Sequence, residues 1–364
     1  MKKFSFLVMI TLLAMAFAAL PTMAQAQEDP EAACYQAYYE AVTAKDTAKS
    51  VKLARECLAK FPQSPNAKYY KGTINKYIAS LQVAFYDALK VYTAAPDAPK
   101  LDKLSAAGEG YMVEKPGDLG VTTYLALATS VGALNGFYKD IDKAKSYTDK
   151  ALQMLETPTP PEGWTVDQYN SLRDTANAKL NQFLGSNALK QSPPNLDQAE
   201  AYFTKATKVK SKTAGEGWKD PYLYYLLATE IHSKRYEQLR AEYDALTADE
   251  KTGEKGKAVL AKIDPVVDKM IIDHARVVAL ATAPASQELK TSSKGDLEAF
   301  WKYKYTKLDG VNEYARSLEA DPLNPPALPP PPENKAPQQL TVVPHKPVKP
   351  GTGKTTPPVK RKPR

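Results

Sequence analysis

Small residues recur at regular helical spacing along much of the chain. Gly72 is followed after twelve residues by Ala84 and after a further twelve by Pro96, and Gly132 and Ala144 repeat the twelve-residue step. Two helices can pack closely only where the side chains between them are small, and a proline ends the helix that precedes it. The spacing therefore predicts an all-α chain built from stacked pairs of helices. Further members of the pattern are Ser50, Cys57, Pro62, Val91 and Ala151.

This pattern resembles the tetratricopeptide repeat family, in particular its exported members in bacterial envelopes. Besides the residues above, the resemblance rests on the junction at 61–65 and on a third set, Gly185, Ala199, Phe203 and Ala206. The chain departs from the family at Tyr38, where a small residue is preferred, and after Ala228, where the small pair is missing. The resemblance implies an α-solenoid of antiparallel helix hairpins over residues 27–246, with irregular insertions, that serves as a non-catalytic protein-binding scaffold.

The N-terminus has the pattern of an export signal. Lys2 and Lys3 precede an apolar run over residues 4–20, and the small-residue triplet at 24–26 follows it. This order predicts a signal peptide at 1–26 that is cut after Ala26, and hence a periplasmic or secreted protein. The alternative is an uncleaved anchor, but the apolar run is short for a membrane span. No transmembrane segment is expected after cleavage.

The C-terminal segment 321–364 differs in composition from the rest. Residues 333–364 carry eight lysines and arginines against one glutamate, which accounts for most of the formal net charge of +8. Pro344, Pro347 and Pro350 recur every third residue, the period of a polyproline helix. We expect this tail to be disordered. It serves either as a solvated tether or as an electrostatic arm for anionic cell-wall polymers or lipid head groups. The near-neutral remainder indicates no nucleic-acid partner.

Two other regions interrupt or follow the predicted repeats. Residues 93–120 contain several prolines and glycines, so we expect a long insertion there rather than a helix. Residues 247–320 should form helices that cap the solenoid. In this region Asp264 and Pro265 are interpreted as the N-cap and first turn of a helix, and further helices are expected over 296–307 and 310–318.

Apparent catalytic motifs lack the context that their chemistry requires. Residues 350–356 resemble the end of a phosphate-binding loop, but Val348 replaces its first glycine and prolines flank it. The cysteines and the three histidines show no metal-ligand spacing, and the acidic residues are interpreted as solvated helix faces. The aromatic and basic run at 300–305 is interpreted as part of the solenoid cap. No catalytic residue, cofactor or metal ion is therefore expected.

The resemblance also implies a binding groove, because the first helix of each hairpin lines the concave face in this family. Tyrosine dominates that face, and its amphipathic ring suits recognition of a protein or peptide partner. The alternative function is binding of cell-wall glycan or another anionic envelope polymer, through the aromatic groove and the basic tail. The candidate residues are Tyr35, Tyr39, Asn66, Tyr69, Lys76, Tyr77, Tyr222, Tyr225, Thr229 and His232.

Cys34 and Cys57 are the only cysteines of the chain. In an exported protein an even number of cysteines is expected to be oxidised. The two residues fall on facing sides of the first predicted hairpin, so we predict a disulfide between them. The competing interpretation is a pair of buried, reduced cysteines.

Overall fold

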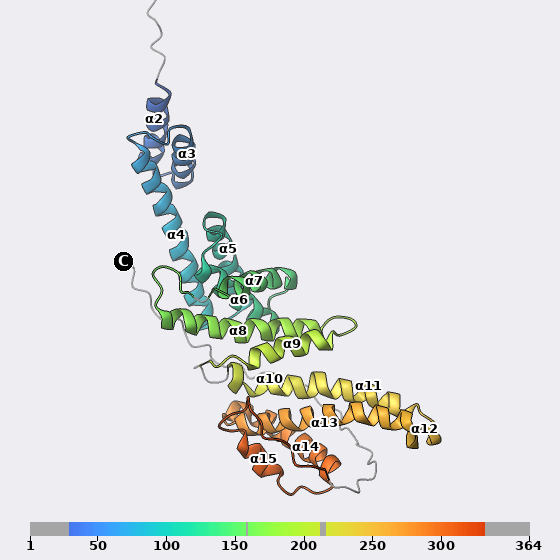
Figure 1. Cartoon of the computed structure of the whole chain (residues 1–364). Coiled ribbons are helices and arrows are strands. Elements are labelled where there is room, and N and C mark those ends of the chain that lie inside the picture. The colour runs from blue at the N-terminus through green and yellow to red at the C-terminus, as the bar shows by residue number, and fades with distance from the viewer. Residues whose placement is uncertain (1–28, 158, 212–215, 332–364) are drawn as a thin grey trace, which may run out of the picture. The chain divides into compact units, whose positions relative to one another are not determined.

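The structure, a computed structural model, describes residues 29–157, 159–211 and 216–331. All regular secondary structure in these ranges is helical, as the sequence predicts (Figure 1). The chain divides into two compact units, Met1–Val83 and Ala84–Arg364, and each is described by itself. The predicted signal peptide, and the predicted tail from residue 332 onward, lie outside the described residues.

The first unit contains α2 (Pro30–Thr43), α3 (Thr47–Lys60) and the beginning of α4 (Ala67–Ala94). Asp29 and Asp46 cap α2 and α3, because their carboxylates accept hydrogen bonds from first-turn amides that have no partner within the helix. α2 and α3 pack against each other. The buried cluster of this unit consists of Tyr38, Ala54, Cys57 and Tyr70.

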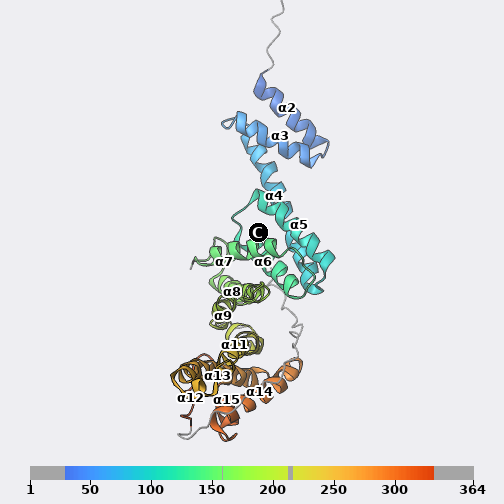
Figure 2. The ribbon, with the colours of Figure 1, turned by 90° about the vertical axis from the view of Figure 1, so that its right-hand side faces the viewer.

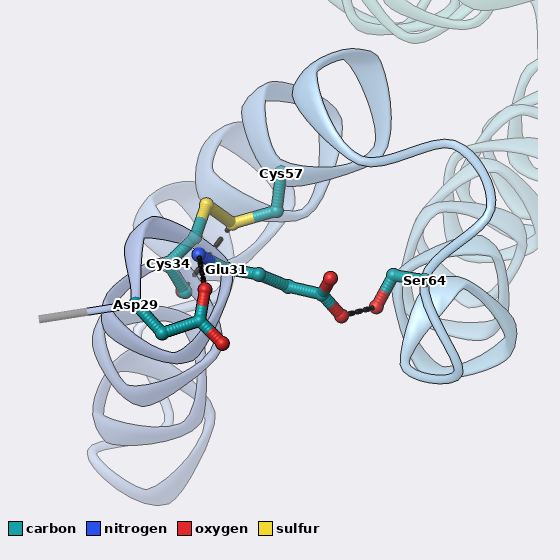
Figure 3. Close-up of a disulfide and its surroundings, with 5 residues drawn as sticks. All are labelled: Asp29, Glu31, Cys34, Cys57 and Ser64. Carbon is teal, nitrogen blue, oxygen red and sulfur yellow. Dashed lines mark hydrogen bonds between the residues drawn. A yellow bond between two sulfur atoms is a disulfide. The ribbon is translucent and has the colours of Figure 1, made fainter.

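A disulfide joins Cys34 of α2 to Cys57 of α3, which confirms the predicted pairing (Figure 3). The bond links residues 23 positions apart. Beside it, the Ser64 hydroxyl donates a hydrogen bond to the Glu31 carboxylate, and the Asn66 amide donates to Ser64 Oγ at 3.0 Å. The start of α4 is thereby held to the start of α2.

The helix α4 contradicts the hairpin predicted from Gly72, Ala84 and Pro96. It continues without a break over 28 residues and ends at Ala94, two residues before Pro96. A Cβ atom on Gly72 would meet nothing within 4 Å, so this glycine is not a point of close helix approach. The sequence between Gly72 and Ala84 contains neither proline nor glycine, and a helix has no local reason to end there.

The insertion predicted at 93–120 is also wrong, because a helix occupies most of it. α5 (Ala98–Glu114) begins after Asp97, whose carboxylate accepts from the Lys100 amide at 2.9 Å, and proline occupies its first turn. The helix buries one apolar face, which includes Leu101 and Leu104. A first-turn proline thus marks the start of a helix here.

Four helices follow and pack in consecutive pairs. α6 (Leu119–Leu134) packs on α7 (Ile141–Leu155), and α8 (Val166–Leu189) packs on α9 (Leu196–Thr207). Small residues lie where the helices approach each other most closely. A Cβ atom on Gly185 of α8 would lie 2.6 Å from the Phe203 ring of α9. A Cβ atom on Gly132 would lie 2.5 Å from Leu101 of α5. Fully buried alanines of α7 and α9 include Ala144, Ala151, Ala199 and Ala206.

The remainder of the second unit is built around α13 (Glu254–Leu280). Three consecutive elements pack against α13: α10 (Pro221–Leu226), a π-helix (Leu227–His232) and α11 (Ser233–Asp244). α12 (Ala248–Thr252), α14 (Gln287–Tyr305) and α15 (Val311–Ser317) also contact it. Short 3-10 helices lie at Gly217–Lys219 and Pro284–Ser286. Figure 2 shows α8, α9, α11 and α13 one below another.

The predicted helix start at Asp264 and Pro265 is wrong. α13 begins ten residues earlier at Glu254, and Pro265 lies inside it. An internal proline removes one backbone hydrogen bond. The neighbouring residues Ile263 and Val267 are buried in the cluster that α13 shares with α14 and α15, so packing outweighs the local preference.

The predicted tail begins too early at residue 321. Pro322 is buried, and the backbone carbonyls of Pro322, Pro326 and Pro329 accept hydrogen bonds from side chains of α13, α15 and α14. Leu328 packs against the core cluster around α13. Residues 322–329 are therefore part of the second unit.

Replacing Gly185 with alanine tests the close approach of α8 and α9. The added methyl group would lie against the Phe203 ring, and we expect a loss of about 1–3 kcal/mol in the free energy of unfolding, as overpacking costs. Gly110→Ala is the matched control, because nothing lies within 4 Å of its Cβ position in α5. The control should be neutral or stabilising by up to about 1 kcal/mol, the ordinary helix preference of alanine over glycine. Equal stability of the two variants in urea titrations would refute the packing argument.

Removing the disulfide should destabilise the first unit. The double variant Cys34→Ala, Cys57→Ala frees a loop of 23 residues, and chain entropy predicts a loss of about 3 kcal/mol in the free energy of unfolding. Circular dichroism melts with and without reductant measure this loss, and the double variant should not respond to reductant. Thiol titration of the denatured, unreduced protein should find no free thiol. A result of two free thiols would contradict the bond.

Candidate functional site

Three predicted tyrosines gather on one surface of the first unit. Tyr35 and Tyr39 lie one turn apart on α2, with ring centroids 6.2 Å apart, and the ring of Tyr69 on α4 lies 6.4 Å from Tyr35. Tyr39 is 53% exposed and Tyr69 is 49% exposed, whereas Tyr35 is partly buried between them. We call Tyr35, Tyr39 and Tyr69 the tyrosine patch. Two of its three rings are therefore accessible at the surface of the first unit.

Two buried tyrosines hold this patch in place. The Tyr38 hydroxyl hydrogen-bonds with Thr73 at 2.7 Å and lies 3.3 Å from the Tyr69 backbone oxygen, to which it donates. The Tyr38 ring packs edge-on against Tyr70 at 5.0 Å. Because Tyr38 connects α2 with α4, it fixes the separation of the two helices that carry the patch. Burial raises the pKa of Tyr70, so its hydroxyl stays protonated at neutral pH.

The other predicted residues of the first unit take different places. Asn66 lies just before α4, where its backbone amide donates a hydrogen bond to Ser64 Oγ. Lys76 and Tyr77 lie about two turns beyond Tyr69 on α4, the lysine exposed and the tyrosine partly buried. Lys68, which was not predicted, has its ammonium group 5.0 Å from the centre of the Tyr69 ring. A cation thus lies beside the exposed tyrosines.

The predicted residues of the second unit do not line an open groove. Tyr222 and Tyr225 stack with centroids 6.2 Å apart, but Tyr225 is only 3% exposed. Thr229 and His232 are buried in the π-helix, where the Thr229 hydroxyl donates to the Tyr225 carbonyl at 2.8 Å. Tyr225, Thr229 and His232 are therefore part of the core, which contradicts their assignment to the groove, whereas Tyr222 is partly buried.

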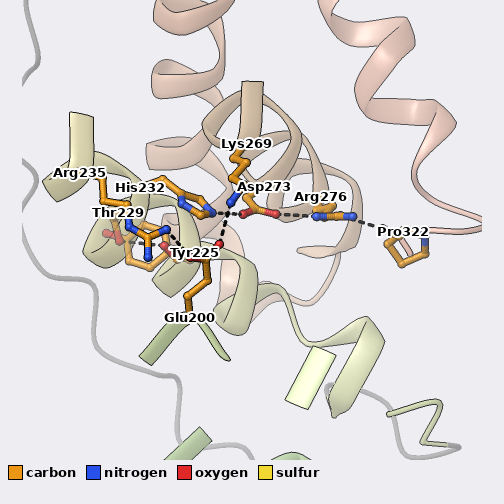
Figure 4. Close-up of polar contacts among 9 residues, drawn as sticks. All are labelled: Glu200, Tyr225, Thr229, His232, Arg235, Lys269, Asp273, Arg276 and Pro322. Carbon is orange, nitrogen blue, oxygen red and sulfur yellow. Dashed lines mark hydrogen bonds and ion pairs between the residues drawn. The ribbon is translucent and has the colours of Figure 1, made fainter. Parts of the chain in front are cut away.

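His232 belongs to a buried polar network (Figure 4). Its Nε2 lies 3.2 Å from Asp273 Oδ2 on α13, and the other oxygen of Asp273 accepts a hydrogen bond of 2.6 Å from Arg276. The Arg276 Nε donates onward to the Pro322 carbonyl at 2.7 Å. His232 and Asp273 are both nearly inaccessible. The arrangement fixes the π-helix and residue 322 to α13, since each buried polar group needs a partner.

A second polar cluster lies closer to the surface. Glu200 of α9 accepts hydrogen bonds from Arg235 of α11 and from Lys269 of α13, the latter at 2.9 Å. Burial has the largest single effect and raises the pKa of Glu200, but the hydrogen bonds from Lys269 and Arg235 together hold it below its ordinary value. Arg235 also pairs with Asp197 at the edge of a recess of about 420 Å³. Two carboxylates neutralise this arginine, so the recess offers no free cation for an anionic ligand.

Neither a metal centre nor a membrane span is found in the described parts of the chain. No group of three or more histidine, cysteine, aspartate and glutamate side chains could hold a metal ion there. None of the helices described is both long and apolar enough to cross a membrane.

Comparison with known proteins identifies no relative. A scan against protein-family models finds no match, and searches of curated proteins and of solved structures find none either.

Some contacts of this chain go beyond what its sequence predicts. Arg276 and Tyr305 donate hydrogen bonds to carbonyls of the proline-rich segment at 322–329, where the sequence predicts a disordered tail. The sequence signal for this contact is the combination of two tyrosines in the aromatic run at 300–305 with prolines three residues apart at 326 and 329.

The Glu200 cluster predicts a pH-dependent stability. Glu200→Gln is expected to lower the free energy of unfolding by about 1–3 kcal/mol at pH 7, because Arg235 and Lys269 lose a charged acceptor. The pKa of Glu200 in the folded state lies below its ordinary 4.5. Its ionised form therefore adds stability that is complete above pH 4.5 and is lost as the pH falls through the folded-state value.

Urea unfolding at pH 7 and pH 3 measures this effect. The difference between the wild type and the variant should shrink at the lower pH. Glu254→Gln is the control, since Glu254 pairs with Lys257 but its side chain is 91% exposed, and such a pair contributes little. Equal losses of unfolding free energy in the two variants would contradict the stabilising role of the Glu200 cluster. A difference between wild type and Glu200→Gln that grows on acidification would contradict it as well.

Proposed function

We propose that this protein is a non-catalytic, exported scaffold of the cell envelope that binds a protein or peptide partner through the tyrosine patch. The scaffold is a helical-repeat solenoid of the tetratricopeptide type, with consecutive helices paired as hairpins. The observation that carries the proposal is the exposure of Tyr39 and Tyr69 beside Tyr35 on a surface that the disulfide and the buried tyrosines hold in place.

Half-exposed tyrosines are suited to binding because they lose little conformational entropy when a partner covers them. Each ring offers apolar area together with a hydroxyl that can donate or accept a hydrogen bond. The ring positions also need no rearrangement, because Tyr38 and the disulfide fix α2 against α3 and α4. A preformed surface avoids part of the cost of association.

The ring geometry favours a peptide over a glycan. The Tyr35 plane is tilted by 30° from that of Tyr39 and by 48° from that of Tyr69. Such rings form an uneven surface with gaps for side chains, whereas a sugar ring stacks best on a flat one. The glycan alternative also relied on the basic tail from residue 333, which lies outside the described residues.

The disulfide supports the proposed location. Such bonds persist in the periplasm and outside the cell and are rare in the cytosol. A link between Cys34 and Cys57 agrees with the signal-peptide pattern at 1–26. The paired packing of α6 with α7 and of α8 with α9 supports the repeat architecture, while the unbroken α4 interrupts it.

The proposal is tested with a peptide selected on the immobilised mature chain from a random library. The double variant Tyr39→Ala, Tyr69→Ala should bind this peptide at least about 30-fold more weakly in calorimetry, since interface tyrosines contribute about 2 kcal/mol or more when they dominate binding. Both side chains are about half exposed, so the variant should melt as the wild type does.

Tyr202→Ala provides the control. Tyr202 is a partly buried tyrosine of the second unit with Lys205 above its ring, as Lys68 lies above Tyr69. Its loss should leave the affinity unchanged. Unaltered affinity in the Tyr39 and Tyr69 variant would refute the proposed site, and cosedimentation with purified wall polymer that depends on these tyrosines would favour the glycan alternative.

A further inference from the structure

A proline-rich segment of the chain lies against aromatic side chains of α14 and α15. The Tyr314 hydroxyl donates a hydrogen bond to the Pro326 carbonyl at 3.2 Å, and the Tyr305 hydroxyl donates to the Pro329 carbonyl at 2.9 Å. Between them, Leu328 packs against the core cluster of the second unit. Two tyrosines thus contact carbonyls of residues that are three positions apart.

This spacing matches the repeat of an extended proline helix. Polyproline II has three residues per turn and rises roughly 9 Å over three residues, and it has no internal hydrogen bonds. Carbonyls at positions i and i+3 therefore point to the same side and are free to accept. Aromatic hydroxyls that donate to such carbonyls are a common means of recognising proline-rich peptides.

The aromatic side chains of this surface form one continuous group. The Trp301 ring lies 4.6 Å from that of Tyr305 and 5.5 Å from that of Tyr314, and its indole N–H is bound to the Asp309 carbonyl at 3.1 Å. Trp301 is almost fully buried, so it forms the base on which the two tyrosines stand. Burial raises the pKa of Tyr314 to about 12 and also raises that of Tyr305. Both hydroxyls therefore remain donors at neutral pH.

We propose that the surface formed by Trp301, Tyr305 and Tyr314 is a recognition site for extended peptides of the type Pro-x-Leu-Pro, and that residues 326–329 occupy it as an intramolecular ligand. The two prolines set the extended conformation, their carbonyls accept from the tyrosines, and the leucine enters the apolar core. A partner that carries this motif binds by displacing the resident segment.

The resident segment is tethered close to the site and therefore competes with a partner peptide for it. Its start is fixed at Pro322, whose carbonyl accepts from Arg276, and Asp321 turns the chain there by accepting from the Leu323 amide and the Asn324 side chain. Only three residues separate Pro322 from Pro326. A short tether of this kind corresponds to an effective concentration in the millimolar range, so a partner must bind tightly or be abundant.

The site is tested on the full chain with a fluorescent peptide of residues 321–331. The variant Leu328→Asp places a charge where the leucine meets the core and should release the resident segment. Fluorescence anisotropy should then show saturable binding of the peptide, at least about tenfold tighter than to the wild type, in which the tethered segment competes. Circular dichroism confirms the fold, and Pro326→Gly, Pro329→Gly replaces this variant if it does not fold.

Two controls separate recognition from nonspecific adhesion. Adding Tyr305→Phe or Tyr314→Phe to the released chain should weaken peptide binding by about threefold to tenfold for each hydrogen bond lost. A peptide of residues 343–351 has prolines at the same spacing but lysine where Leu328 stands, and it should not bind. Failure of the 321–331 peptide to bind a folded, released chain, or equal binding of the two peptides, would overturn the proposal.

Discussion

Close packing of helices at glycine residues holds the second unit together. The Phe203 ring of α9 occupies the space that a side chain at position 185 of α8 would need, and Leu101 of α5 does the same at Gly132 of α6. Each contact lets two backbones approach and exclude water from the faces between them. These pairs are also joined to their neighbours, because α8 packs against α6 and α9 against α10.

Exclusion of water in turn requires that buried polar groups find partners within the protein. Ser130 and Thr148 satisfy each other at 2.8 Å between α6 and α7. Asp273 pairs with His232 Nε2 and accepts a hydrogen bond from Arg276 around α13. In the first unit, the tighter constraint is covalent: the disulfide fixes α2 against α3 and so holds the backbone from which Tyr35 and Tyr39 project.

The sequence predicted those features that depend on residue type at short range. The glycines at 132 and 185 and the pairing of the two cysteines required only helical spacing and composition. The internal Pro265 of α13 depends on packing at long range, because its neighbours Ile263 and Val267 are buried in the core cluster. The unbroken α4 and the start of α5 have local signals instead: neither proline nor glycine lies between Gly72 and Ala84, and Asp97 with a first-turn proline begins α5.

The tyrosines illustrate the same limit. The projected groove face includes Tyr35, Tyr39 and Tyr69 together with Tyr225, Thr229 and His232. Tyr39 and Tyr69 are exposed and Tyr35 is partly buried, whereas the other three are buried. Part of the reason for Thr229 and His232 is the π-helix over Leu227–His232, whereas Tyr225 precedes it in α10. An added residue in a helical turn rotates the side chains beyond it by about 100°, so a face projected with the ordinary α-helical period falls on the wrong side.

Hydrogen-exchange mass spectrometry of the mature chain, with and without a selected peptide, tests the central claim most directly. If the tyrosine patch is the binding surface, bound peptide should slow exchange in the segments 31–43 and 66–77, which carry the patch, and leave the segment 221–232 unchanged. Slowed exchange confined to 221–232, with no change around Tyr39 and Tyr69, would show that the binding surface lies elsewhere.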